Sequence, residues 1–292
     1  MWLALRSHWP EYLMEAAELG AFMLAACAAA VVLFDAESPV ARALPIPVLQ
    51  RLLMGFAMGG TAVAIIYSPW GKRSGAHFNP AVTLTFLRLG KIHPWDAAFY
   101  VVFQFAGGLA GVLLAAAVLG KALASPGVDY IVTVPGLEGA VVAFLGEFAI
   151  SFLLMNAVLY SSNNPPLAPY TGWMVGVLLV IFVTVEAPLS GMSMNPARTF
   201  GSAVPAGVWT TWWVYFTAPP LAMLAAAECY AWVRGRHRVL CAKLNHQTTQ
   251  RCIFLNCAHR QFSGRHEGGR QTDRVTSSHE ANLADERREA TP

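Results

Sequence analysis

Residues 75–83 read GAHFNPAVT, and residues 191–199 read GMSMNPART. Both place Asn-Pro-Ala in a short apolar segment, residues 77–87 and 194–203, of about ten residues, which is too short to cross a bilayer. Asn is favoured just before a helix, and Pro is favoured at the first helical position, where a missing N–H costs nothing. Each motif therefore predicts the start of a half-helix and not the interruption of a longer helix.

The composition of the 292-residue chain is that of a membrane protein. Hydrophobic residues make up 55% and charged residues 13% of it, and the mean hydropathy is +0.46, whereas soluble domains carry about 25% charged residues. Runs long enough to cross a bilayer are expected near Tyr12–Phe34, Val48–Tyr67, Trp95–Leu119, Val141–Tyr160, Pro169–Val185 and Trp209–Val233. We predict an all-α membrane protein with six transmembrane helices and two half-helices, in contact with the lipid bilayer and not with nucleic acid.

Basic residues cluster in segments that the six expected spans place on one side of the membrane. They are Arg6, then Lys72, Arg73, Arg88 and Lys91 after the second span, and Arg234, Arg236, Arg238 and Lys243 after the sixth. Cytoplasmic loops carry an excess of Lys and Arg. Both termini are therefore expected in the cytoplasm, with the chain as a multi-pass protein of the plasma (inner) membrane.

The body of the chain, residues 1–233, contains an internal repeat over about 11–120 and 138–233. Each half has two spans, a Gly-containing polar stretch, an Asn-Pro-Ala segment and a third span, and Asn79 and Asn195 stand 116 positions apart. Because each half has an odd number of spans, the halves must be inserted in opposite orientations. Inverted repeats typically place a site at the midplane, built by interrupted helices. Residues 234–292 form a polar tail that is predicted to be largely disordered after about 260.

Half-helices that begin inside the membrane leave unpaired N–H groups and positive dipole ends at that depth. The residues that lead into them, 75–78 and 191–194, are expected to be extended and to line a water-filled path. We predict a pore centre made of Asn79, Pro80, Ala81, Asn195, Pro196 and Ala197, and a pore lined by Gly75, Ala76, His77, Gly191 and Ser193. The alternatives are that each motif only begins a helix in a loop, and that His77 is a packed histidine that orients its loop.

Acidic residues lie near the start of the first span of each half, Glu15 and Glu18 in the first and Glu147 in the second. We expect them to be buried and to accept hydrogen bonds from backbone N–H groups of the two loops. We favour this structural role over a proton relay. No nucleophile–base pair or dedicated catalytic metal set occurs within the spans, so the sequence does not indicate an enzyme.

Four segments carry a family resemblance. SGAHFNPAVT (74–83) and GMSMNPARTFGSAV (191–204) resemble the two signature loops of the aquaporin and glycerol-facilitator family, the major intrinsic proteins. The resemblance also includes GEFAISFLL (146–154) and WVYFTAP (213–219), and it covers nearly all of residues 11–233. It implies the same six helices and two half-helices, one pore per subunit, and a homotetramer.

The resemblance also implies which residues form the narrowest part of the pore. By their spacing from the two motifs, this selectivity filter consists of Gly59, Val183, Met192 and Arg198. A shift of one position would bring Met58 or Gly60 in place of Gly59. Water-selective members have a Phe/His pattern at the first two positions, so a wider and less polar filter is expected here. Arg198 is expected to offer donors to the permeating molecule and to repel cations, or to form an ion pair with Glu186.

Such a filter implies a passive channel for water and/or small neutral solutes (glycerol, urea, undissociated metalloid acids) that excludes protons and ions. Thr199 stands where glycerol facilitators usually have Asp, so the combination resembles wide-pored nodulin-like or bacterial members. The alternative function is a non-conducting relative that acts as a membrane sensor or scaffold through its tail.

The tail contains Cys241, His246, Cys252 and Cys257 in the pattern C-x4-H-x5-C-x4-C. Three thiols and an imidazole are a full tetrahedral set of ligands for Zn²⁺, and His259 is a competing ligand. The alternative is unrelated cysteines in a basic segment that lies on anionic lipid. Apart from this site, no cofactor is expected.

Overall fold

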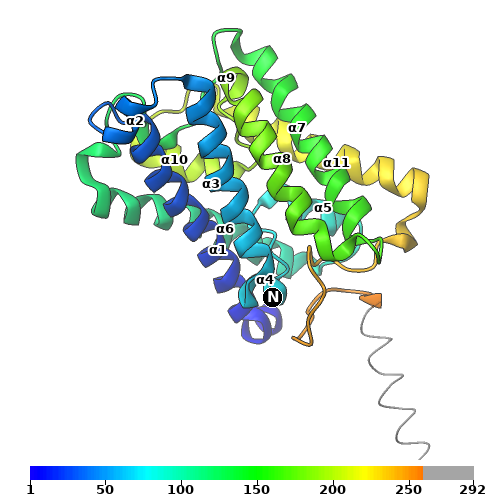
Figure 1. Ribbon diagram of the computed structural model, residues 1–292. Coiled ribbons are helices and arrows are strands. Elements are labelled where there is room, and N and C mark those ends of the chain that lie inside the picture. Colours follow the sequence, from blue (N-terminus) through cyan, green and yellow to red (C-terminus); the bar gives the residue numbers. More distant parts are fainter. Residues whose placement is uncertain (259–292) are drawn as a thin grey trace, which may run out of the picture.

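Six long helices form a single bundle around two short ones in the computed structural model, which describes residues 1–258 (Figure 1). The long helices are α1 (Trp2–Phe34), α3 (Pro47–Tyr67), α6 (Pro94–Leu119), α7 (Gly139–Ser162), α8 (Thr171–Val185) and α11 (Trp212–Arg234). The predicted half-helices are α5 (Pro80–Arg88) and α10 (Pro196–Ala206). Short turns of helix are α2 (Pro39–Ala43), α4 (Pro69–Ser74), α9 (Ala187–Ser190), η1 (Gly120–Ala122), η2 (Asp129–Ile131), η3 (Ala168–Tyr170) and η4 (Arg236–Arg238). The all-α fold class is therefore confirmed.

Helices α1, α3, α6, α7 and α8 are long and apolar enough to cross a membrane. Helix α11 is not apolar enough to be counted with them, because its Trp, Tyr and Pro residues reduce its hydropathy. It is nevertheless the sixth long helix of the bundle and packs against α7. Helix α1 begins ten residues earlier than expected, at Trp2. Its polar first turns are accommodated because His8 and Glu11 pair with Asp96 and Arg73.

The packing of the helices follows the inverted repeat. In the first half α1 packs against α6 and α3, and in the second half α7 packs against α11 and α8. The halves meet where α3 contacts α8, and each half-helix crosses to the other half, α5 to α11 and α10 to α6. The two half-helices therefore lie between the halves, where each can reach the loop of the other.

Residues 239–258 follow η4 and pack back onto the bundle (Figure 1, orange), and residues 239–257 contain no helix or strand. Leu240 N donates to Asn163 Oδ1 over 2.7 Å, and Leu255 N donates to Lys91 O over 2.8 Å. This segment lies at the same end of the bundle as the N-terminus, which is called the tail side below. The predicted disorder after about 260 concerns residues outside the described part of the chain.

Small residues allow the helices to approach closely, which is the usual way in which membrane helices pack. A Cβ on Gly107 of α6 would lie 2.1 Å from the carbonyl oxygen of Ala16 on α1. A Cβ on Gly59 of α3 would lie 2.5 Å from the carbonyl oxygen of Gly176 on α8, whereas one on Gly60 would meet nothing within 4 Å. The contact between the two halves therefore depends on Gly59.

This contact predicts opposite results for two neighbouring substitutions. Gly59→Ala forces α3 and α8 apart and destabilises the protein by about 1–3 kcal/mol, as overpacking does in a tight interior. Gly60→Ala meets open space and raises helix propensity, so it leaves stability unchanged or slightly higher. The measurement is the midpoint of thermal unfolding in detergent. Equal midpoints for the two variants would contradict the packing described here.

Candidate functional site

The two Asn-Pro-Ala motifs begin α5 and α10. Asn79 Oδ1 accepts from Ala81 N over 2.9 Å, and Asn195 Oδ1 accepts from Ala197 N over 3.0 Å and from Arg198 N over 3.2 Å. Each asparagine has an extended backbone, and Pro80 and Pro196 are the first helical residues. Side-chain caps of this kind satisfy donors that a helix start otherwise leaves unpaired.

The remaining atoms of the two asparagines join the motifs to each other. Asn79 Nδ2 donates to Met194 O over 2.8 Å, and Asn195 Nδ2 donates to Phe78 O over 2.8 Å. Each accepting carbonyl belongs to the residue just before the opposite asparagine. The pair of bonds is therefore reciprocal, and it fixes the two helix starts against each other in the middle of the bundle.

Glu147 holds the loop before α10 from α7. Its carboxylate accepts from Ser193 N over 2.5 Å and from Met194 N over 2.7 Å, and from Ser190 Oγ over 2.9 Å. The side chain is fully buried. Backbone N–H groups of an irregular loop inside a membrane need such acceptors, because there is no water to take their place.

Glu15 holds the loop before α5 in the same way. It accepts from His77 N over 2.9 Å and from Phe78 N over 2.6 Å. Glu18, one turn further along α1, does not reach these N–H groups and accepts instead from Ser74 Oγ over 2.8 Å. Glu15 is therefore the counterpart of Glu147.

The backbone of the two loops differs from the extended form expected from the sequence. Ala76 and Phe78 have positive φ angles of 57° and 30°, and Met192 and Met194 have 52° and 54°. Positive φ at alternate residues turns successive N–H groups towards one side, which forms a concave site for an anion. The carboxylate of the first helix in each half occupies that position, which offsets the cost of about 1–3 kcal/mol for each strained residue.

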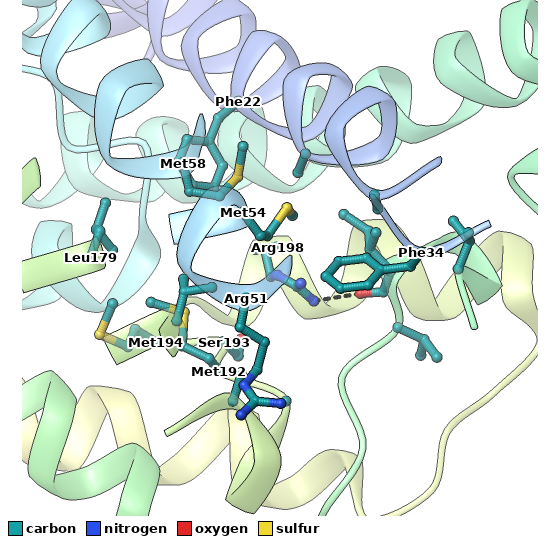
Figure 2. Close-up of a pocket in the computed structure, with 18 of the residues that line it drawn as sticks. Phe22, Phe34, Arg51, Met54, Met58, Leu179, Met192, Ser193, Met194 and Arg198 are labelled. Atoms are coloured by element: carbon teal, nitrogen blue, oxygen red, sulfur yellow. Dashed lines mark hydrogen bonds between the residues drawn. The ribbon is translucent and has the colours of Figure 1, made fainter. Parts of the chain in front are cut away.

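A cavity of about 220 Å³ lies on the side of the motifs away from the tail side (Figure 2). Its wall includes Val183, Gly191, Met192, Ser193 and Arg198.

Gly59 is absent from this wall, because it faces α8. The preceding residue of α3, Met58, lines the cavity instead, together with Met54 one turn earlier (Figure 2). Of the two residues that a shift of one position offers in place of Gly59, Met58 therefore lines the cavity, and the assignment of the filter itself stays a prediction.

Arg198 points into this cavity and is held by the protein backbone. Its Nη1 donates to Ile131 O over 2.8 Å (Figure 2). No ion pair between Arg198 and Glu186 occurs in the described part of the chain. One edge of the guanidinium is therefore fixed by the Ile131 carbonyl, and the group forms part of the cavity wall.

A second, narrower cavity of about 60 Å³ continues towards the tail side. Asn79, Asn195 and His77 line it, together with Leu244 of the tail. The two cavities share the side chains Phe22, Leu179, Ser193, Met194 and Arg198. They therefore adjoin, and both asparagines line the second of them. Gly75 and Ala76, which were predicted to line the pore, face neither cavity.

His77 combines both roles considered for it, since it lines the narrow cavity and is also packed. Its Nε2 donates to Ala242 O over 2.8 Å, and its Nδ1 lies 3.1 Å from Thr83 Oγ1. Its ring stacks between Phe86 and Phe254, with centroids 5.1 Å and 5.4 Å away. Two of these contacts come from the tail.

Sequence reasoning missed several residues of the wide cavity. Arg51 reaches into it, with Nε donating to Thr184 O over 3.1 Å. An arginine inside a predicted span is a signal that was available, because such a residue is costly and usually functional. The apolar residues Phe22 and Met54 gave no signal, since a pore wall and a lipid-facing surface look alike in the sequence.

The tail brings together the four residues predicted as metal ligands. The ligand atoms of Cys241, His246, Cys252 and Cys257 all lie within 4.8 Å of one another. The Cys241 and Cys252 Sγ atoms are 3.6 Å apart, and Cys257 Sγ is 3.1 Å from His246 Nε2. Ligands at about 2.3 Å from a tetrahedral zinc ion stand about 3.8 Å apart. Hydrogen bonds from Cys241 and then Cys252 hold the pKa of the Cys257 thiol well below its usual range.

The role of Glu147 in holding its loop predicts a large effect for one substitution on α7. Glu147→Ala leaves two buried N–H groups without acceptors, at about 1–3 kcal/mol each. The midpoint of thermal unfolding in detergent should be much lower for Glu147→Ala than for the wild type. Ser151→Ala, one turn along, is the control, because the Ser151 hydroxyl is buried without a protein partner in the described residues. If Glu147→Ala unfolds at the same temperature as this control, the loop is held in some other way.

The sequence of the chain is similar to those of known proteins. The sequence model described as Major intrinsic protein matches residues 5–230. "Probable aquaporin NIP-type" of Nicotiana alata is 36% identical over 184 residues, covering 62% of this chain and 66% of that protein. "Putative aquaporin NIP4-1" of Arabidopsis thaliana is 34% identical over 212 residues, covering 72% of this chain and 69% of that protein. The chain thus spans about two thirds of the length of these curated relatives.

A solved structure supports the fold. The aquaglyceroporin from Plasmodium falciparum superposes with a TM-score of 0.67 at 17% identity, covering 78% of this chain and 97% of the other. Because the family match extends over most of the chain, the protein belongs to the major intrinsic protein family, whose members are channels and not enzymes.

Proposed function

We propose that this chain is a passive transmembrane channel for water and small neutral solutes. The observation that carries the proposal is the pair of adjoining cavities, the second of which is lined by the reciprocal asparagines. In this proposal the two cavities form one path for the solute. The relatives described as aquaporins and the fold of an aquaglyceroporin support it.

The centre of the path favours neutral molecules over ions. The positive ends of two half-helix dipoles meet there, and a cation would lose its hydration shell against them. Arg198 adds a fixed positive charge to the wide cavity just beyond, with donors that a hydroxyl or carbonyl oxygen can accept. Protons and cations are repelled, and small polar solutes are bound weakly enough to pass.

The wall of the wide cavity favours solutes larger than water. Met54, Met58 and Met192 line it together with Val183. Methionine is unbranched and adapts its shape, so these walls can yield to a solute while keeping contact with its carbon atoms. We therefore propose Met58, Val183, Met192 and Arg198 as the selectivity filter, with glycerol, urea and undissociated metalloid acids as the solute class.

The tail side corresponds to the cytoplasm in this proposal, and the membrane to the plasma (inner) membrane. Arg251 Nη1 donates to Ser7 O over 3.1 Å, so the tail lies beside the start of α1. The basic residues Lys72, Arg73 and Lys91 border the same side, which agrees with the bias of cytoplasmic loops. The functional unit is a homotetramer with one path in each subunit.

The test is stopped-flow light scattering on proteoliposomes that contain the full chain, treated with a membrane-permeant zinc chelator. We expect water and glycerol to move faster than in empty liposomes. Met192→Trp narrows the filter and should lower glycerol flux by roughly tenfold or more, with a smaller effect on water. Met174→Trp, on the exposed face of α8, is the matched control and should leave both fluxes unchanged. Flux no faster than in empty liposomes would favour the non-conducting sensor or scaffold.

We also propose that Cys241, His246, Cys252 and Cys257 bind one Zn²⁺. Thiolate and imidazole ligands at these separations suit a closed tetrahedral zinc site. The alternative of unrelated cysteines lying on lipid is disfavoured because all three thiols are buried.

Zinc analysis of the purified protein tests this site. We expect one zinc per chain in the wild type and a large loss of zinc in Cys252→Ser, because three ligands hold the ion far less well than four. Cys229→Ser removes an exposed cysteine of α11 outside the cluster and should retain its zinc. A wild-type protein that carries no zinc after purification in zinc-containing buffer rules the site out.

A further inference from the structure

Residues 239–258, called the plug segment below, pack against the tail-side end of the narrow cavity. Leu244 lines the narrow cavity together with Asn79 and His77, although it is far from them in the sequence. Its backbone N donates to Gly75 O over 3.1 Å. A carbonyl of the loop that leads to the first asparagine is therefore bound to the plug segment and not to a permeating molecule.

Two further residues of the plug segment fill the space beneath His77. Ala242 accepts the hydrogen bond from the imidazole Nε2, over 2.8 Å. The Phe254 ring stacks on the imidazole at 21° and meets Tyr100 edge-on at 6.3 Å. The fit is close, because a Cβ on Gly75 would stand only 2.8 Å from the Phe254 ring. His77 is only 1% exposed as a result.

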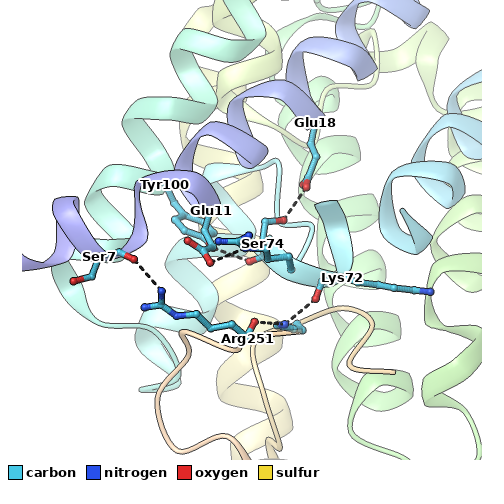
Figure 3. Close-up of polar contacts among 9 residues, drawn as sticks. Ser7, Glu11, Glu18, Lys72, Ser74, Tyr100 and Arg251 are labelled. Atoms are coloured by element: carbon cyan, nitrogen blue, oxygen red, sulfur yellow. Dashed lines mark hydrogen bonds and ion pairs between the residues drawn. The ribbon is translucent and has the colours of Figure 1, made fainter. Parts of the chain in front are cut away.

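Polar contacts attach the plug segment to the rest of the chain around this mouth, and Figure 3 shows those with Ser7 and Lys72. Lys243 Nζ donates to Lys72 O over 2.7 Å and to Arg251 O over 2.9 Å, and Arg251 in turn reaches Ser7 O. Lys91 Nζ donates to Asn256 O over 3.1 Å. The contacts are thus made with the start of α1, with α4 and with the loop that follows α5.

Residues 239–257 of the plug segment contain no helix or strand to keep them in place. Fixing an irregular backbone costs conformational entropy at every residue. Burial of apolar side chains of the segment, Leu244 and Phe254 among them, offsets part of this cost. The cysteine–histidine cluster supplies the missing constraint. Ala242, Lys243 and Leu244 lie between the ligands Cys241 and His246, and Phe254 lies between Cys252 and Cys257. A metal held by all four ligands therefore positions each residue that contacts the mouth.

The charges around the cluster suit a zinc ion with three thiolates, which carries one net negative charge. Lys243 is 2% exposed and Lys91 is 8% exposed, and neither has a carboxylate partner in the described part of the chain. A buried ammonium without a counter-charge is costly. The zinc–thiolate cluster next to them provides that charge, so metal and lysines stabilise each other.

We propose that zinc bound by Cys241, His246, Cys252 and Cys257 holds the plug segment in the tail-side mouth and closes the channel, and that loss of zinc opens it. The inference rests on the proposed channel and on the proposed zinc site. Release of the plug segment frees the Gly75 carbonyl and the His77 imidazole, and it removes Leu244 from the narrow cavity.

Glycerol flux through proteoliposomes with the full chain tests the proposal, using Zn²⁺ itself as the probe. Zinc-loaded protein should conduct slowly, treatment with the membrane-permeant chelator should raise the flux several-fold, and added Zn²⁺ should reverse the rise. Cys252→Ser should conduct at the higher rate whether or not Zn²⁺ is added. Cys229→Ser, the control, should respond as the wild type does.

Phe254→Ala distinguishes the effect of the plug segment on flux from the effect of the metal. It removes a ring from the mouth and keeps all four ligands, so zinc content should stay at one per chain while the flux of zinc-loaded protein rises. Equal and appreciable flux with and without zinc would overturn the plug and leave the channel standing. Flux that stays at the level of empty liposomes after zinc removal would overturn both. A channel that conducts and binds no zinc would overturn the zinc-held plug alone.

Discussion

The structure depends above all on the crossed hydrogen bonds between each asparagine amide and the carbonyl before the other asparagine. The oxygen of each side chain caps its own half-helix while the nitrogen holds the opposite loop. Each amide thus uses both of its functional ends, and neither can turn without losing one bond. The position of both half-helices, and therefore the path between them, follows from this pair.

A second layer of contacts supports the pair and repeats in both halves. The Tyr100 hydroxyl donates to Ser74 O over 2.7 Å, and the Tyr215 hydroxyl donates to Ser190 O over 2.6 Å. With the carboxylates on α1 and α7, these side chains give the loop polar groups partners where water is absent. An inverted repeat predicts this result, because the same contacts then recur in each half on opposite sides of the centre.

Much of this arrangement could be predicted from the sequence, because the chemistry is local. An Asn-Pro pair specifies a helix start at a known residue, and a buried acid in a span requires a donor nearby. The residue of α3 that lines the wide cavity was harder to predict, because successive helical residues point about 100° apart. A shift of one position exchanges Gly59, which faces α8, for Met58, which lines the cavity. The positive φ angles of Ala76 and Met192 were missed because neither residue type favours them.

The docking of the tail was also beyond sequence reasoning. Its cysteines and histidine predicted a metal-binding cluster. The contacts of Leu244 and Phe254 with the mouth, in contrast, follow no periodic pattern in the sequence. They depend on shape, namely the space above Gly75 that a residue with a side chain would fill.

The most direct test of the central claim measures the internal pH of zinc-free proteoliposomes with a trapped pH-sensitive dye. The measurement is made during glycerol uptake, while a proton gradient is imposed across the membrane. Paired dipole ends and reciprocal asparagines predict rapid glycerol entry while the internal pH stays as it does in empty liposomes. A pH change that keeps pace with the glycerol would contradict a path centred on the two motifs.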